Sequence, residues 1–286
     1  MEDIKNSRSG PIMITIAAIL WSFTGVCVKY VEWSAMSLAC FRSICGVLIF
    51  MIYMKFPKLK LNKYNIFGAL CMLVTSVTYI LANKLTTAAN AVVLHYTAPL
   101  FVMLYSTLIK KQRPTKADLI MCVTVILGCG LAFADKLDAG AFLGNVLAII
   151  SGISFAGTMV VNAMKETDSM QAQLQGNIIT MVVLLPFLLT DTAITLDPRA
   201  WAAALFLGFI QYGLSHIIFS IGIKRISAIS ASLISTAEPI CSPIWVFLVL
   251  GEKIGGLALA GFIIVVAAVI VYNYTLMRKE TKKAVN

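Results

Sequence analysis

Charged residues are scarce in this chain. Only 13% of its 286 residues are charged, whereas 59% are hydrophobic. An average soluble domain has about 25% charged and about 45–50% apolar residues, so a soluble protein of this size could not bury so much apolar surface. The composition therefore excludes an ordinary soluble protein.

Metal-binding and catalytic patterns are missing as well. The seven cysteines form no CxxC pair or metal spacing, and two histidines are too few for a His-based metal site. HExxH, GxGD, GxSxG and Walker sequences do not occur. We therefore expect no metal, no cofactor and no enzymatic activity, and we interpret the cysteines as packing residues.

What the chain does contain is a series of long apolar runs. Ten of them approach the 17–25 residues or so that cross a bilayer as a helix, and the connections between them are short. They run over 11–31, 35–54, 63–82, 86–109, 116–134, 141–162, 171–189, 200–222, 226–250 and 255–276. The first follows only the polar tail 1–10 and lacks a clear cleavage site, so we read it as a helix rather than a signal peptide. The sequence predicts an all-α polytopic membrane protein with ten transmembrane helices.

Positive charge is concentrated in alternate connections. With the N-terminus inside, the cytoplasmic segments hold 17 of the 23 basic residues. This asymmetry follows the positive-inside rule and predicts both termini in the cytoplasm. The net charge of +10 is thus explained by topology. The basic connections suit contacts with anionic lipid, and no nucleic-acid partner is expected.

The two halves of the chain resemble each other. At an offset of 140 residues, "LHYTAPLFV" (94–102) falls on "ISTAEPICS" (234–242), and at 132 "WSFTG" (21–25) matches "ISFAG" (153–157). Each half contains five spans, and an odd number places the second half in the membrane upside down. Inverted five-helix repeats are typical of secondary transporters, whose substrate site lies at the midplane between the halves.

Two segments carry a family likeness: the closing segment "AEPICSPIWVFLVLGEKIGGLALAGFIIVVAAVIV" (237–271) and "SLACFRSICGVLIF" (37–50). The chain resembles the EamA-type members of the drug/metabolite transporter superfamily. The resemblance implies a secondary transporter in a bacterial cytoplasmic membrane that moves a small organic metabolite, often an exported amino acid. One departure is that the first repeat has Ala98-Pro99 where many members repeat Glu-Pro.

The predicted organisation is a tail (1–10), a first repeat (11–134), an outer linker (135–140), a second repeat (141–276) and a basic tail (277–286). Alternatives remain open at this point. They are a proton-coupled importer, a broad drug or amine efflux pump, and a membrane protein that acts as a structural element or receptor. Glycines such as Gly128 and Gly130 favour close helix packing and leave a homodimer open.

Ionisable groups within the spans are candidates for the site because each costs roughly 2.5–3.5 kcal/mol in a bilayer. With a rise of about 1.5 Å per residue, Glu238 and His95 lie roughly 18 Å and 14 Å into their helices, near the midplane. Pro239 and Pro243 loosen the helix around Glu238. Glu238 either binds a proton or a substrate ammonium, or it satisfies helix ends and pairs with Arg42.

His95 either contacts the substrate as a donor and acceptor or bonds to a neighbouring helix. Arg42 holds a substrate carboxylate or forms a structural pair, and His216 is a further buried titratable group. An apolar pocket with a few directed polar groups suits a small metabolite. The remaining substrate-binding candidates are mostly aromatic and come from both halves: Trp21, Tyr79, Tyr96, Phe155, Tyr212 and Ser235.

Overall fold

The computed structural model describes every residue except 1, 29, 87, 135–141, 251–254 and 286. The described residues form helices and short connections, without strands, which confirms an all-α protein. In chain order the helices are α1 (Glu2–Trp21), α2 (Thr24–Val28), α3 (Ala35–Tyr53), α4 (Lys63–Leu85), α5 (Ala88–His95), α6 (Ala98–Lys110), α7 (Lys116–Phe133), α8 (Phe142–Asn162), α9 (Ser169–Thr190), α10 (Pro198–Leu205), the π-helix η2 (Phe206–Leu214), α11 (Ser215–Gly222), α12 (Ala228–Ser235), α13 (Ala237–Leu250) and α14 (Gly256–Val285). The predicted linker 135–140 lies outside the described residues.

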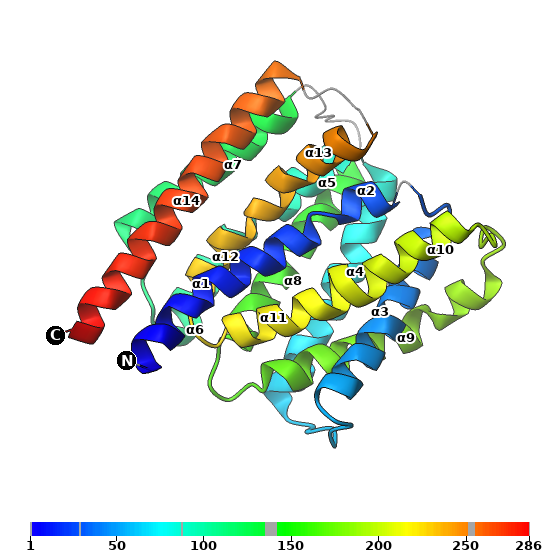
Figure 1. Ribbon diagram of the computed structural model, residues 1–286, viewed down its shortest axis with the longest axis horizontal. Helices are drawn as coiled ribbons and strands as arrows, with labels where there is room; N and C mark the ends of the chain where they lie inside the picture. The colour runs from blue at the N-terminus through cyan, green and yellow to red at the C-terminus, as the bar shows by residue number, and fades with distance from the viewer. Residues whose placement is uncertain (1, 29, 87, 135–141, 251–254, 286) are drawn as a thin grey trace.

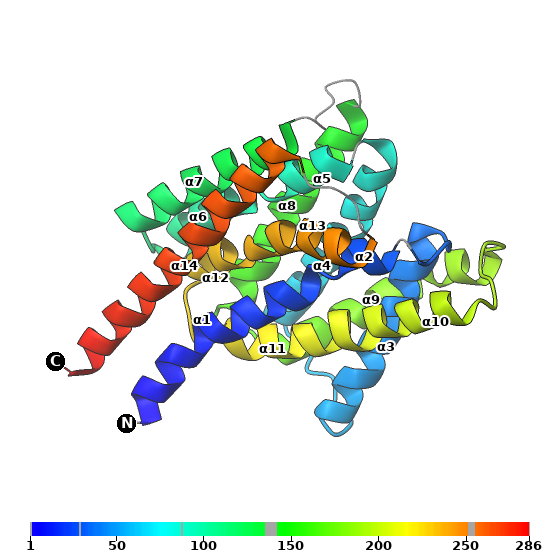
Figure 2. The same ribbon diagram turned by 45° about the horizontal axis from the view of Figure 1, so that its top comes forward.

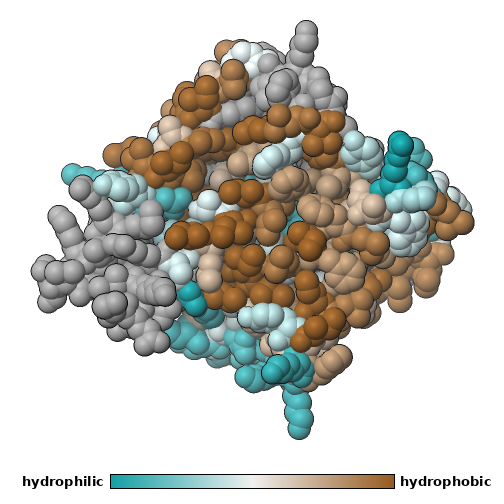
Figure 3. All heavy atoms as spheres, in the orientation of Figure 1, coloured by the Kyte–Doolittle hydropathy of each residue, from teal (hydrophilic) through white to brown (hydrophobic). Residues whose placement is uncertain are grey.

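Six helical stretches in the described part of the chain are long and apolar enough to cross a membrane. They cover 35–53, 63–82, 91–110, 142–162, 169–190 and 198–222, and shorter apolar helices cover 9–21, 228–241 and 259–275. Large apolar side chains point outward, among them Leu108 (69% exposed) and Leu127 (67% exposed). Figure 3 shows hydrophobic residues over much of one face, with hydrophilic ones gathered at its edges. Such a surface fits a multi-pass membrane protein.

Four of the predicted spans are interrupted in the structure. Three spans break, at 22–23, 96–97 and 236, and a fourth is π-helical rather than α-helical over 206–214. Pro99 and Pro239 lie in the first turn of the segments that follow two of these breaks, α6 and α13. A proline there lacks the N–H that would continue the preceding helix, and its ring clashes with the preceding turn. The predicted polar tails differ too, since α1 begins at Glu2 and α14 extends to Val285.

The helices pair in a pattern that matches one half of the chain with the other. Helix α4 packs on α8 and α1 packs on α11, while α3 packs on α9 and α7 on α14. Figure 1 shows α7 and α14 side by side along one edge, and Figure 2 shows the same pairing from another angle. Helix α1 begins and α14 ends at the same end of the molecule.

Apolar side chains from both halves form the largest buried cluster. It joins α1, α6, α7, α8, α11, α12, α13 and α14 through residues such as Ile14, Val102, Phe219 and Leu233. A Cβ atom on Gly128 of α7 would lie 2.2 Å from Cγ2 of Val265 on α14. The close helix packing expected at Gly128 is therefore made between two helices of the same chain, α7 and α14. A Cβ atom on Gly130 would meet nothing within 4 Å.

Candidate functional site

Two broken helices, α5/α6 and α12/α13, meet near the middle of the molecule. At the first break the Thr97 hydroxyl donates to the Leu94 carbonyl at 2.6 Å, and at the second the Thr236 hydroxyl donates to the Leu233 carbonyl at 2.6 Å. The Leu94 carbonyl also accepts from the Thr97 N–H at 3.3 Å, so the two hydroxyls add side-chain donors to carbonyls at the ends of interrupted helices. Such backbone is tolerated at membrane depth where it is buried in protein or lines a cavity.

A hydrogen bond connects the two breaks. The hydroxyl of Tyr96 donates to Oε2 of Glu238. Tyr96 is 4% exposed, and Glu238 is half-buried. The first half of the chain thus supplies the donor and the second half supplies the acceptor. A bond to a carboxylate is roughly twice as strong as a neutral one, so it holds the two breaks together.

His95 lies at the end of α5, against α8. Its Nδ1 atom is 2.8 Å from Oγ of Ser151, and its ring centroid is 4.8 Å from that of Tyr79 and 5.1 Å from that of Phe155. A Cβ atom on Gly152 would lie 2.7 Å from the His95 carbonyl oxygen. Glycine is therefore what lets α8 approach the break so closely. His95 is bonded to a neighbouring helix and also faces other aromatic rings.

A second group of rings lies against the first. Trp21 is 6.5 Å from Phe155 and 5.2 Å from His216, and His216 is 4.3 Å from Tyr212, all measured between ring centroids. Nδ1 of His216 is 2.8 Å from the Tyr212 carbonyl and 3.4 Å from Nε1 of Trp21. The Tyr212 contact requires a proton on Nδ1, whereas the Trp21 N–H can donate only to an unprotonated Nδ1, so the two bonds belong to different tautomers of His216.

Arg42 completes the arrangement. Its guanidinium carbon lies 4.6 Å from the centre of the Tyr212 ring, in a cation–π contact. Its Nε atom is buried and has no hydrogen-bond partner in the protein. Glu238 and Tyr79 are near enough to interact with its charge. Among the described residues, the ion pair within 4 Å is Lys60–Asp168, so Arg42 and Glu238 form no direct pair.

We call these side chains the central cluster. It brings together nine residues, eight of them from eight different helices and Tyr96 from the break between α5 and α6: Trp21, Arg42, Tyr79, His95, Tyr96, Phe155, Tyr212, His216 and Glu238. Ser235 is not brought into it by any described bond, because its hydroxyl donates to the Ala231 carbonyl of its own helix. In the described chain, no three His, Cys, Asp or Glu residues lie close enough to hold a metal ion.

Several features of this region could not be read from the sequence. Gln211 donates to the Trp21 carbonyl at 3.1 Å and to the Thr24 hydroxyl at 2.8 Å, which supports the α1/α2 break. Trp245 stacks on Phe23 with centroids 4.5 Å apart. The π-helical stretch η2 carries Gln211 and Tyr212 on adjacent positions. Apolar runs of this kind give no local signal that separates a π-helix from an α-helix.

Broken helices with half-buried charged groups inside a helical bundle are the form of a transporter site, and comparison with known proteins agrees. The EamA-like transporter family model matches residues 8–134 and 142–274. The chain belongs to the EamA-like transporter family. It is therefore a transporter rather than an enzyme, and the resemblance found in its motifs is confirmed.

Individual relatives extend over nearly the whole chain. "Uncharacterized transporter YwfM" of Bacillus subtilis is 26% identical, covering 96% of each chain. "Pseudopaline exporter CntI" of Pseudomonas aeruginosa is 22% identical and covers 94% of this chain and 97% of its own. A solved crystal structure aligns with a TM-score of 0.78 and 18% identity over 93% of this chain. That likeness shows the fold.

Proposed function

We propose that this transporter carries a small organic metabolite, an amino acid or a related compound, through the central cluster. The observation that carries the proposal is the bond between Tyr96 and Glu238, which joins one broken helix from each half. A solute between these breaks contacts both halves at once. Rocking one half against the other then exposes it to each side of the membrane in turn.

The charges of the cluster fit a solute that has both an amine and a carboxylate. Arg42 has a buried Nε without a partner in the protein, and a guanidinium binds carboxylates through paired N–H donors. Glu238 is the complementary group for an ammonium or for a coupling proton. The rings of Trp21, Phe155 and Tyr212 supply the apolar walls that orient such a solute.

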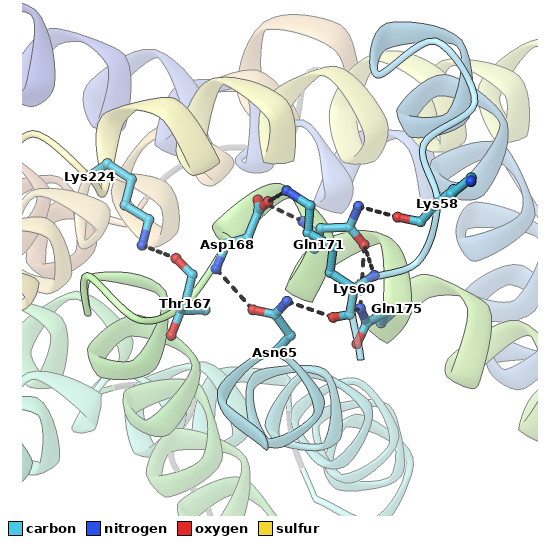
Figure 4. Close-up of polar contacts among 8 residues, drawn as sticks. All are labelled: Lys58, Lys60, Asn65, Thr167, Asp168, Gln171, Gln175 and Lys224. Carbon is cyan, nitrogen blue, oxygen red and sulfur yellow. Dashed lines mark hydrogen bonds and ion pairs between the residues drawn. The ribbon is translucent and has the colours of Figure 1, made fainter. Parts of the chain in front are cut away.

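The proposed topology has ten spans in two inverted repeats, 11–134 and 141–276, with both ends of the chain in the cytoplasm. The support for this topology comes from contacts at or beside four connections, 54–62, 111–115, 163–168 and 223–227. We call these connections the basic end. Lys60 pairs with Asp168 at 3.4 Å, Lys224 donates to the carbonyls of Met164 and Thr167, and Lys110 lies near Glu166. Figure 4 shows residues of 54–62, 163–168 and 223–227 close to one another. The meeting of three of these connections with the end of α6 supports a single cytoplasmic end.

Cysteine substitution with an impermeant maleimide tests this topology. Lys60→Cys and Lys111→Cys are expected to react from the cytoplasmic side, and Asp197→Cys from outside. Asp138, the other outer position, lies outside the described residues. Reaction of position 111 from outside would contradict the inverted repeats.

We further propose that transport runs outward across a bacterial cytoplasmic membrane. The support is a relative whose name is that of a pseudopaline exporter, together with the amino-acid exporters that the motifs resemble. The experiment is a thermal-shift screen of amino acids, amines and nucleobases, followed by uptake of each stabilising solute into proteoliposomes. We expect saturable uptake that unlabelled solute inhibits. Solutes that stabilise the protein but never cross the liposome would instead indicate a receptor.

A further inference from the structure

One face of α9 carries a row of buried polar side chains. Ser169, Gln173, Asn177 and Thr180 are spaced four, four and three residues apart, so they lie on one side of the helix. They are 2%, 2%, 0% and 1% exposed. Each has a side-chain oxygen with no hydrogen-bond partner in the protein: Oγ, Oε1, Oδ1 and Oγ1 respectively. We call these four residues the α9 polar row.

On the other side of the same helix, the Gln171 amide is bonded through both its oxygen and its nitrogen, whereas Oε1 of Gln175 also has no partner in the protein. Oε1 of Gln171 accepts from the Lys60 N–H at 3.1 Å, and its Nε2 donates to the Lys58 carbonyl at 3.1 Å. These bonds appear in Figure 4, where Gln171 and Gln175 face the Lys58–Lys60 connection. A buried polar atom without a partner costs about 1–3 kcal/mol. Four such atoms in line on one helix therefore call for a ligand role rather than a packing role.

The polar row leads from the basic end toward the central cluster. At the basic end, Ser169 lies two residues after Thr167, whose carbonyl accepts a hydrogen bond from Lys224. Further along, a Cβ atom on Gly46 of α3 would lie 2.7 Å from Oδ1 of Asn177. Gly46 is one helical turn from Arg42 on α3, so Asn177 lies about one turn from the level of the Arg42 backbone.

Two other helices present similar atoms near the basic end. Ser220 of α11 is 2% exposed and Asn162 of α8 is 1% exposed, and Oγ of Ser220 and Oδ1 of Asn162 have no partner in the protein. Ser220 lies one turn before Lys224, and Asn162 lies two residues before Met164. Because Lys224 donates to the Met164 carbonyl, these residues come from segments that meet at this end.

We propose that the α9 polar row is a second solute site, between the basic end and the central cluster, that binds the amine of the solute. The side-chain amide oxygens of Gln173 and Asn177 accept hydrogen bonds and cannot donate them, and the four unpartnered atoms of the row are all oxygens, so the row offers acceptors to an N–H donor. The Lys224 ammonium already makes bonds of this kind to backbone carbonyls at the basic end. The inference rests on the proposed function, because it places this site on the path to the central cluster.

The test uses labelling chemistry, so it needs no known substrate. Asn177→Cys is compared with Ile178→Cys, the adjacent residue, which packs with Phe50 and Ile217. Membrane vesicles are treated with 2-aminoethyl methanethiosulfonate or its 2-sulfonatoethyl analogue, and modification of the peptide is counted by mass. Leu59→Cys, at an exposed position (47%), gives the intrinsic ratio of modification by the two reagents. Gln173→Cys is measured alongside in case Asn177→Cys does not fold.

We expect Asn177→Cys and Gln173→Cys to be modified while Ile178→Cys stays unmodified. Relative to Leu59→Cys, the amine reagent should be favoured over the sulfonate by about tenfold, the size of one hydrogen bond to a donor. Modification no faster than at Ile178→Cys, or a ratio equal to that of Leu59→Cys, would overturn the proposal. Labelling as expected in a protein that carries no solute into proteoliposomes would retain the site and remove the transport function proposed above.

Discussion

The two broken helices have the same backbone arrangement and different chemistry. Thr97 and Thr236 each donate to the carbonyl three residues earlier at 2.6 Å. The first break continues as Thr97-Ala98-Pro99, whereas the second continues as Thr-Ala-Glu-Pro over 236–239. Aligned on these threonines, Glu238 is an additional residue between alanine and proline. The two threonines are therefore 139 residues apart. Ala98 and Glu238, which the repeat alignment pairs, are 140 residues apart.

This difference explains how two similar halves form one asymmetric site. The first break supplies donors and rings through His95 and Tyr96, and the second supplies the carboxylate. A carboxylate in both halves would place two like charges close together, which is unfavourable for both. The absence of Glu-Pro from the first repeat is therefore consistent with a site that needs one acidic group.

The largest effect is expected from removing the acidic group of the second break. Glu238→Gln keeps the size of the side chain but removes its charge. We expect uptake to fall by about a hundredfold, because bonds to buried charged groups contribute up to about 3 kcal/mol. The protein should still fold and reach the membrane. If Glu238 binds the coupling proton, the variant also loses its pH dependence but keeps solute exchange. Uptake like that of the wild type, with an unchanged pH profile, would leave Glu238 as a structural residue.

A smaller effect is expected from the donor side of the first break. His95→Ala removes the ring beside Tyr79 and Phe155, and we expect solute affinity to fall about 30-fold, for a loss of about 2 kcal/mol. Ser235→Ala is the matched control in the second half, since the Ser235 hydroxyl bonds within its own helix. Calorimetry should show less than about a twofold change for it. Equal losses in both variants would mean that the two breaks contribute alike.

The smallest effect concerns the feature that the breaks share. Thr97→Val and Thr236→Val each remove one hydroxyl bond to a carbonyl, worth about 1 kcal/mol. In a protein of this size that corresponds to a fall in Tm of about 2–4 °C. Because the two bonds have the same length, we expect equal shifts in a thermal unfolding scan. A much larger shift at one position would show that the two breaks are not equivalent supports.

The class of fold and most residues of the central cluster could be predicted from the sequence because both depend on strong local signals. Apolar run length identifies the spans, and the cost of burying charge identifies Glu238 and Arg42. The interruptions depend on tertiary packing: α1 breaks where Gln211 bonds the Trp21 carbonyl, a contact between positions 190 residues apart. The bond from Tyr96 to Glu238 and the polar row of α9 likewise depend on which faces meet. No local pattern specifies them.

A double-mutant cycle on Tyr96 and Glu238 tests the central claim most directly, namely that the solute is held between the two breaks by groups acting together. Affinity for a solute found in the screen is measured by calorimetry for Tyr96→Phe, Glu238→Gln and the double variant. If the bond between them positions Glu238, Tyr96→Phe alone costs about fivefold. It should then cost almost nothing once Glu238 is glutamine. Losses that simply add, or unchanged affinity in all three variants, would contradict a shared site at the two breaks.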